Sequence, residues 1–237
     1  MSDISDTGQP AGWELIWRGD KIPPKYFSMA APSPTVVELA AMLLSGGAVL
    51  DIDCGLGRHC LYLGKQGFQV AGMDISPTGV ETTRAVCAEH NITFDGKVAD
   101  MQALPWPDAV FDGAFSIASL HHHLRPNLVK ALHEVRRVLK PGGVFAADFP
   151  STASAQYQSL RKQVVAGELS EPEPNTFVDE RPEVDEDDDA FLPHHFCDED
   201  DLRDLMQRFE VLSMQTEIND SSKPGRWVVF ARKPLVK

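Results

Sequence analysis

The sequence predicts an α/β fold in which a mostly parallel sheet is covered by helices on both faces. Two observations predict it: from residue 48 onward, short apolar segments alternate with amphipathic ones, and turn residues separate them. Strands are expected at 48–52, 68–74, 92–100, 110–119 and 144–149. Helices are expected between them at 57–66, 77–90 and 126–139.

The expected helices carry recognisable end signals. Ser76 suits the cap of the second helix, and Pro77 suits its first position. In the helix that Pro126 opens, apolar residues share one face. These residues are Leu128, Leu132, Val135 and Leu139. This helix is expected to end before the fifth strand at Lys140, Pro141, Gly142 and Gly143.

The flanking segments complete the expected fold. Two late strands, 211–218 and 226–233, have no helix between them, so they are expected to form an antiparallel pair at the sheet edge. Further helices are expected at 13–18, 33–44, 153–165 and 198–209.

Composition favours one soluble domain. The 237 residues are 43% hydrophobic, enough for a sizeable core, and the longest apolar run, 36–44, is too short for a bilayer and contains Glu38. No signal peptide and no membrane span are expected. The four cysteines form no CxxC pair, so reduced thiols and a cytoplasmic location are expected.

The net charge of -13 is unevenly distributed along the chain. Residues 168–204 contain 16 acids and 2 bases, whereas the rest contains 19 acids and 20 bases. We expect the acidic segment to be a solvated, mobile loop, with a lid that attracts a cationic substrate as the alternative. Because no basic patch is evident, a nucleic-acid partner is not expected.

The turn DIDCGLGRH follows the first strand, where open α/β sheets bind ligands. Gly55 and Gly57 permit close backbone approach, and Asp74 ends the next strand, where a carboxylate can accept both ribose hydroxyls. A pyrophosphate here would face Asp51 and Asp53, and like charges at about 4 Å repel by roughly 4 kcal/mol at an effective dielectric of about 20. An adenosine cofactor with a positive sulfur and amine, S-adenosylmethionine, suits this turn better.

The chain resembles the class I S-adenosylmethionine-dependent methyltransferases over residues 48–149. Four segments carry the resemblance in order: VLDIDCGLG, GMDIS, VADMQALPWPDAVFDGAFS and LHEVRRVLKPGG. The resemblance implies a doubly wound seven-stranded sheet of order 3-2-1-4-5-7-6, with strand 7 antiparallel. It implies that Asp51, Gly55 and Gly57 line the methionine part of the cofactor, that Asp74 holds the ribose, that Asp100 meets the adenine amine, and that Met101 packs on the ring.

One departure from the family pattern is Asp53, which stands where the first glycine of a Gly-x-Gly-x-Gly turn is usual. Its side chain either points away from the cofactor or contacts the cofactor amine, and we expect it to point away, because strand and turn side chains alternate in direction. Arg58 is expected to pair with the cofactor carboxylate or with Asp53, or to lie at the surface. Ile75 and Ser116 complete the expected cofactor-binding set.

Histidines mark the expected acceptor side. His122, in the triplet that follows the fourth strand, is the candidate general base, with a structural or pocket-wall role and metal ligation as the alternatives. His121, His195 and Trp17 are expected near the acceptor. No metal site is expected, because the spacing of the histidines does not suggest convergent ligands.

The segment before the first strand is expected to fold over the cofactor. Its aromatic residues are Trp13, Trp17, Tyr26 and Phe27, and the alternative for the tryptophans is that they cover the core.

The predicted function is methyl transfer from S-adenosylmethionine to a small-molecule acceptor. The alternative is a protein of the same fold that binds the cofactor without transferring a methyl group, and a nicotinamide oxidoreductase is disfavoured by the acids of the turn. One domain, 1–237, is expected. Its parts are a helical cap (1–45), a cofactor-binding core (46–150), an acidic insertion and possible lid (151–197), and a C-terminal helix with edge strands (198–237). Acceptor identity and oligomeric state stay open.

Overall fold

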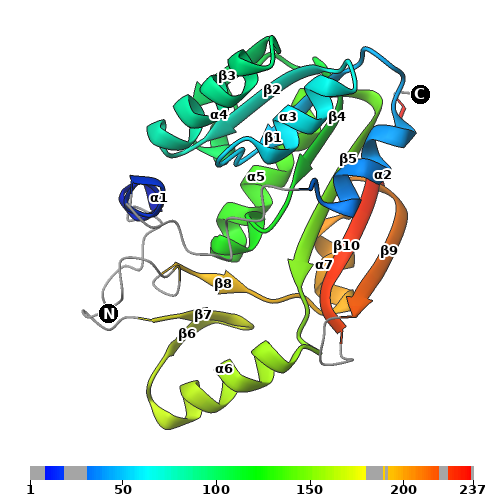
Figure 1. Cartoon of the computed structure of the whole chain (residues 1–237). Coiled ribbons are helices and arrows are strands. Elements are labelled where there is room, and N and C mark those ends of the chain that lie inside the picture. Colours follow the sequence, from blue (N-terminus) through cyan, green and yellow to red (C-terminus); the bar gives the residue numbers. More distant parts are fainter. Residues whose placement is uncertain (1–8, 19–30, 180–188, 190–191, 219–223, 236–237) are drawn as a thin grey trace.

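A seven-stranded sheet forms the centre of the molecule (Figure 1). The computed structural model describes residues 9–18, 31–179, 189, 192–218 and 224–235. The strands of the sheet are β1 (Ala48–Ile52), β2 (Gln69–Asp74), β3 (Phe94–Val98), β4 (Phe111–Ser116), β5 (Leu139–Pro150), β9 (Glu210–Ile218) and β10 (Pro224–Arg232). Their order is β3-β2-β1-β4-β5-β10-β9, with β10 antiparallel to both neighbours. Since β9 and β10 are the sixth and seventh strands of this sheet, the predicted order is confirmed.

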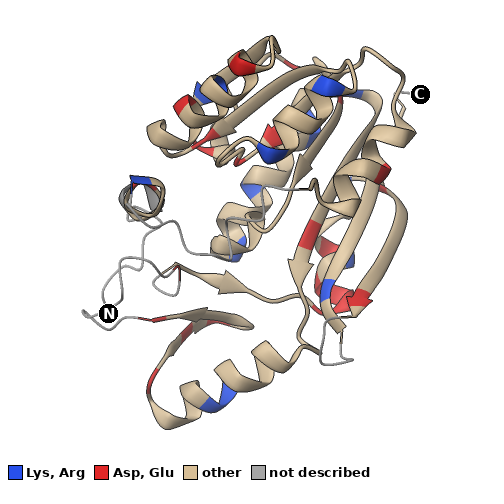
Figure 2. Cartoon of the chain, viewed as in Figure 1, with Lys and Arg blue, Asp and Glu red and all other residues tan. Residues whose placement is uncertain are grey.

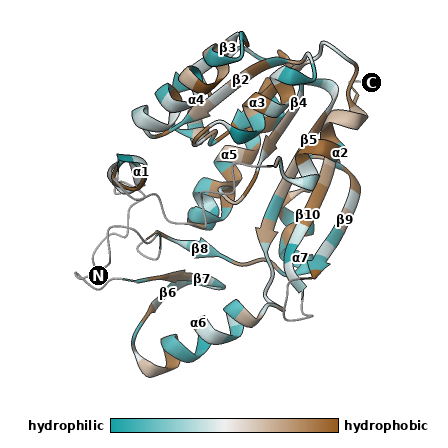
Figure 3. Ribbon diagram, in the orientation of Figure 1, coloured by the Kyte–Doolittle hydropathy of each residue, from teal (hydrophilic) through white to brown (hydrophobic). Residues whose placement is uncertain are grey.

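Helices cover both faces of the sheet, as predicted. Helices α2 (Pro34–Met42), α3 (Arg58–Lys65) and α4 (Pro77–Glu89) contribute to one buried cluster, which includes Val36, Leu63 and Val80. Helices α5 (Arg125–Val138) and α7 (Glu199–Leu205) contribute to a second cluster, which includes Leu132 and Leu202. Figure 3 shows hydrophobic residues along the central strands between these layers. The two clusters hold the sheet rigidly, so that the turns at its carboxyl end keep a fixed geometry.

The predicted helix signal at Ser76 is confirmed. Its hydroxyl accepts a hydrogen bond from the backbone N–H of Gly79 at 3.1 Å, and Pro77 follows in the first turn of α4. Within the part of the chain that the structure describes, no helix has both the length and the apolar composition needed to span a membrane.

The acidic segment differs from the expected loop. A second sheet, antiparallel, consists of β6 (Ser170–Glu173), β7 (Thr176–Val178) and β8 (His194–His195), and α6 (Ala155–Ala166) precedes it. The prediction of a solvated, mobile loop is therefore wrong for residues 170–178, while residues 180–188 lie outside the described part. Figure 2 shows acidic residues on β6 and in α7.

Aromatic packing explains why the small sheet forms. Phe177 of β7 is 1% exposed, and its ring contacts Tyr157 of α6 and Phe196 after β8 at centroid distances of 5.5 and 5.6 Å. The buried rings of Phe177 and Phe196, with the partly buried ring of Tyr157, supply a local core that the acidic composition concealed.

Candidate functional site

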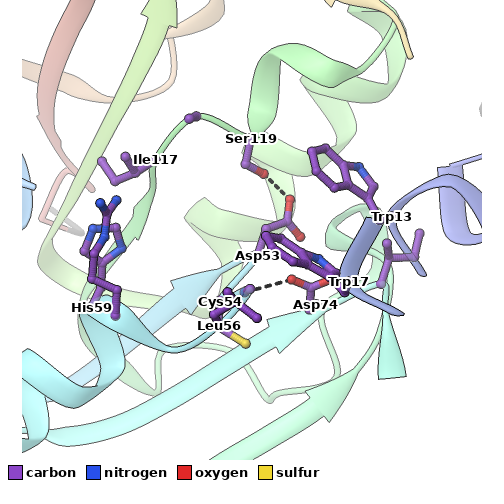
Figure 4. A pocket seen from close by; sticks show the side chains of 13 residues that line it. Trp13, Trp17, Asp53, Cys54, Leu56, His59, Asp74, Ile117 and Ser119 are labelled. Carbon is purple, nitrogen blue, oxygen red and sulfur yellow. Dashed lines mark hydrogen bonds between the residues drawn. The ribbon is translucent and has the colours of Figure 1, made fainter. Parts of the chain in front are cut away.

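A cavity of about 160 Å³ lies at the carboxyl ends of β1, β2 and β4 (Figure 4). The turn between β1 and α3, the end of β2, the turn after β4, and helix α1 (Gln9–Arg18) form its wall. The lining residues are Trp13, Trp17, Asp53, Cys54, Gly55, Leu56, Arg58, His59, Asp74, Ile75, Ile117, Ala118 and Ser119. This is the edge at which open α/β sheets bind ligands.

The turn after β1 requires glycine. Gly55 and Gly57 have φ values of +50° and +85°, in the left-handed region that glycine adopts without steric cost. A Cβ at Gly57 would lie 3.0 Å from the Cα of Thr83, so α4 packs directly on the turn. The hydroxyl of Thr83 also donates to the carbonyl of Gly55 at 2.9 Å. Helix α4 thus fixes the backbone of the turn on one side, and the turn is open toward the cavity on the other.

Asp74 is anchored at the end of β2. Its Oδ2 accepts from the backbone N–H of Gly55 and its Oδ1 from that of Ser76, both at 2.9 Å. Burial raises the pKa of Asp74 to about 6, although these two amide hydrogen bonds lower it. The carboxylate is oriented by its own turn and retains acceptor capacity toward the cavity.

Asp53 lines the cavity, so the expectation that it points away is wrong. Its carboxylate accepts a hydrogen bond from the hydroxyl of Ser119 (Figure 4). Strand alternation does not extend to this residue, because β1 ends at Ile52 and Asp53 has a φ of +64°. Burial and the neighbouring charge of Asp74 raise the pKa of Asp53 well above its usual value.

Asp51 is 2% exposed and is not among the residues that line the cavity. It accepts a hydrogen bond from the thiol of Cys60 at 3.3 Å, and burial raises its pKa to about 7. Three carboxyl groups with raised pKa values, the buried ones of Asp51 and Asp74 and the partly buried one of Asp53, therefore lie in or near one site. A ligand with a positive charge would stabilise their ionised forms, whereas a pyrophosphate would be repelled.

Helix α1 covers the cavity. Trp17 packs on Gly55, since a Cβ on that glycine would lie 3.2 Å from the indole ring. Glu14 attaches the helix to the start of α4, where it accepts from the Thr78 hydroxyl at 2.8 Å and from the hydroxyl of Ser76. The expectation that Trp13 and Trp17 lie over the pocket is confirmed, whereas Tyr26 and Phe27 lie outside the described residues.

The histidines gather beside the cavity. His121 and His122 belong to the short helix η4 (Leu120–His122), their ring centroids are 4.0 Å apart, and the ring of His194 lies 4.6 Å from that of His122. The ring of His122 also packs against the ring of Trp13, with their centroids 5.2 Å apart. His121 and His122 do not themselves line the cavity, so their acceptor-side roles stay predictions.

His195 is placed differently. It is 1% exposed, and its ring nitrogens contact Thr176 Oγ1 at 2.7 Å and Asp201 Oδ2 at 2.9 Å. It is not one of the residues that line the cavity, and its assignment to the acceptor stays a prediction without support from these contacts.

Comparison with known proteins identifies the family. The family described as "Methyltransferase domain" matches residues 50–147. Residues 50–147 form a class I S-adenosylmethionine-dependent methyltransferase domain. This match covers the strands and turns that build the cavity, and it agrees with the resemblance seen in the sequence.

Named relatives support this family. The chain is 40% identical over 98 residues to sterol 4-C-methyltransferase strm-1 of Caenorhabditis elegans, covering 40% of this chain and 29% of that protein. It is 39% identical over 110 residues to the S-adenosyl-L-methionine-dependent Diels-Alderase iccD of Talaromyces variabilis, covering 44% and 36%. The matches span about a third of these relatives.

The fold of nearly the whole chain also has a solved counterpart. A SAM-dependent methyltransferase structure from Methanosarcina mazei superposes with a TM-score of 0.69 at 24% identity, covering 87% of this chain and all of that one. At this level of identity the likeness concerns the fold.

The cavity contains part of the predicted residue set. Gly55, Arg58, Asp74 and Ile75 line the cavity. Asp51, Gly57, Asp100, Met101 and Ser116 are outside the lining, and their contact with a cofactor stays a prediction. Sequence reasoning missed Cys54, Leu56, His59, Ile117, Ala118 and Ser119. The position of 117–119 directly after β4, at the same sheet edge as the glycine turn, was the available signal.

Proposed function

We propose that this chain transfers the methyl group of S-adenosylmethionine to a nucleophilic atom of a small-molecule acceptor. The observation that carries the proposal is the hydrogen bond between the glycine turn and Asp74, which holds a buried carboxylate facing the cavity. The pKa values of Asp74 and of Asp53, which also lines the cavity, are both raised. The family match over 50–147 supports the same activity.

Each part of the cofactor has a candidate partner in the chain. Asp74 would accept hydrogen bonds from the ribose hydroxyls, and the backbone of Gly55 would admit the methionine part close to the turn. Asp53, and Asp51 behind it, would attract the sulfonium and ammonium charges. Asp100 would meet the adenine amine. It caps the short helix η3 (Met101–Ala103) by accepting from the N–H of Gln102 at 2.8 Å.

Bound S-adenosylmethionine supplies an electrophilic methyl group, so the protein mainly has to align the acceptor and exclude water. Trp13 and Trp17 cover the cavity and would exclude water from it. His122, 3% exposed beside Trp13, is the proposed group that receives a proton from the acceptor. We further propose a cytoplasmic location, supported by four free cysteines, and no nucleic-acid partner.

Calorimetric titration with S-adenosylmethionine, and separately with its demethylated product, tests the cofactor site. Because a hydrogen bond to a charged group contributes about 1.5–3 kcal/mol, Asp74→Asn is expected to weaken binding at least about 10-fold. Asp53→Gly is also expected to weaken it, since glycine suits the positive φ and only the carboxylate is lost. Asp200→Asn, at an exposed position in α7, is the control. Unchanged affinity in Asp74→Asn would contradict the assignment of this site.

The second candidate function is cofactor binding without methyl transfer. It is favoured by the similarity to a Diels-Alderase named as S-adenosyl-L-methionine-dependent, and by the carboxylate of Asp53 inside the cavity. Release of demethylated cofactor in a broad acceptor screen distinguishes the two. Tight binding with no release for any acceptor would favour the second function.

A further inference from the structure

Three histidines from two distant segments converge beside the methyltransferase cavity. His121 and His122 come from η4, and His194 comes from β8 of the small sheet. One ring nitrogen of each lies within 4.8 Å of the others. The carboxylate of Asp189 lies 3.9 Å from Nε2 of His122 and 3.8 Å from Nε2 of His194. The sequence spacing concealed this convergence, because the small sheet brings His194 to the turn after β4.

The surroundings suit a metal ion. The side chains of His122 and His194 are 4% and 14% exposed. Nδ1 of His121 is shielded from solvent and has no hydrogen-bond partner within the described part of the chain. The nearby charge of Arg226 is paired with the carboxylate of Asp148. Ligand nitrogens around tetrahedral Zn²⁺ are about 3.3 Å apart, so a decrease of up to about 1.5 Å in the distances between the ring nitrogens would complete three ligands.

A second group of potential ligands is less suitable. His195, Cys197 and Asp201 also lie within 4.8 Å of one another. Both ring nitrogens of His195 already have partners, and Asp201 additionally pairs with the guanidinium of Arg125 at 2.9 Å. A cation there would compete with a charge that the protein already supplies.

We propose that His121, His122 and His194 bind one divalent transition-metal ion, with Zn²⁺ the best match to three imidazole ligands. Asp189 would partly neutralise the ion. This proposal replaces the expectation of no metal site, and it follows from geometry that the sequence did not reveal.

The position of the site suggests its use. Ser119, two residues before His121, lines the cavity, and Trp13 contacts both the cavity and His122. An ion there would face the acceptor side and would lower the pKa of a bound hydroxyl or thiol. Since the ion would bind the lone pair of the His122 ring, that nitrogen could not accept a proton. The ion would then activate the acceptor in place of a general base. This role rests on the proposed function, whereas metal binding itself does not.

Titration of the tag-free, chelator-treated chain with Zn²⁺ alone, followed by calorimetry, tests the site. One ion per chain is expected, and Co²⁺ should give the visible absorption of a tetrahedral complex. Loss of a partner outside the ligand set weakens metal binding by up to about 100-fold, so His121→Ala and His194→Ala, which each remove a ligand, are expected to weaken it by at least about 100-fold. Asp189→Asn is expected to weaken it less. His133→Ala, exposed on α5, is the control and should bind as the natural chain does.

Two results would overturn the proposal. One is the absence of saturable Zn²⁺ binding by the natural chain. The other is binding that survives in both folded histidine variants but disappears in Cys197→Ser, which would place the ion in the second group. Circular dichroism establishes that each variant is folded. The Zn²⁺ titration contains neither cofactor nor acceptor. A chain that binds Zn²⁺ but never transfers a methyl group would therefore support this site and contradict the proposed function.

Discussion

The carboxyl group of Asp51 is expected to make the free energy of unfolding depend on pH. Its native pKa is about 7, against an ordinary value of 3.8, because burial disfavours the carboxylate. The native carboxyl therefore holds its proton at pH values where the unfolded one has lost it. Stability contributed by this group is present below the ordinary pKa and is lost as the pH rises toward and through about 7.

Asp51→Asn should remove this penalty. Without ligand, the variant is expected to match the natural chain near about pH 4 and to exceed its unfolding free energy by up to about 4 kcal/mol near pH 8. Urea unfolding across this range measures the difference, in which contributions of titrating groups that do not interact with Asp51 cancel. A constant difference between the two chains would show that Asp51 does not titrate in this window.

Gly57 illustrates how backbone conformation and packing combine. Gly57 and Gly67 share a φ of +85°, but a Cβ at Gly67 would meet nothing within 4 Å, whereas at Gly57 it would lie 3.0 Å from Thr83. Gly67→Ala should cost about 1 kcal/mol of unfolding free energy from the positive φ alone. Gly57→Ala should cost roughly 2–4 kcal/mol, because a close contact is added. Equal losses in chemical denaturation would mean that Thr83 yields without cost.

Single residues were predictable where one physical requirement determined them. Gly55 and Asp74 line the cavity as expected, since a turn at the carboxyl end of β1 needs glycine and the end of β2 faces the same edge. Asp53 was placed wrongly, because its direction depends on a backbone φ of +64° after the strand has ended. Alternation predicts side-chain directions only while the chain remains a strand.

At the level of elements, periodicity predicted the main sheet and its helices but not the small sheet. Strand β7 contributes three buried residues, Thr176 to Val178, within a segment whose acidic composition favoured a loop. The partners of Phe177 are Tyr157 and Phe196, which lie on either side of the acidic run in the sequence. Such contacts cannot be inferred from the pattern of one short segment.

Helix α1 shows how an element outside the family match shapes the site. It is attached to α4 through Glu14, and its Trp17 rests on the glycine turn. The cavity of about 160 Å³ is smaller than the roughly 300 Å³ at which small-molecule pockets usually begin. When a cofactor fills the site, we expect Trp17 to move outward from Gly55.

At the scale of the whole molecule, Cys197 links the two sheets. Its N–H donates to the carbonyl of Pro150 at the end of β5, and its carbonyl accepts from the indole of Trp227 at 3.0 Å. Arg125 at the start of α5 adds an ion pair with Asp201 of α7. These contacts lead us to expect that the acidic insertion and the cofactor-binding core unfold together.

Thermal unfolding with the demethylated cofactor tests this expectation. A ligand at about 100 times its dissociation constant stabilises the native state by roughly 2.7 kcal/mol. For a unit of this size, such a gain should raise Tm by about 5–10 °C. One transition that shifts as a whole is expected in the natural chain, and Asp74→Asn should shift far less at the same concentration. Two transitions, with only one shifted by the ligand, would show that the insertion unfolds apart from the core. In that case the contacts at Cys197 would not couple the small sheet to the cofactor site, because ligand binding would stabilise only the unit that holds the glycine turn.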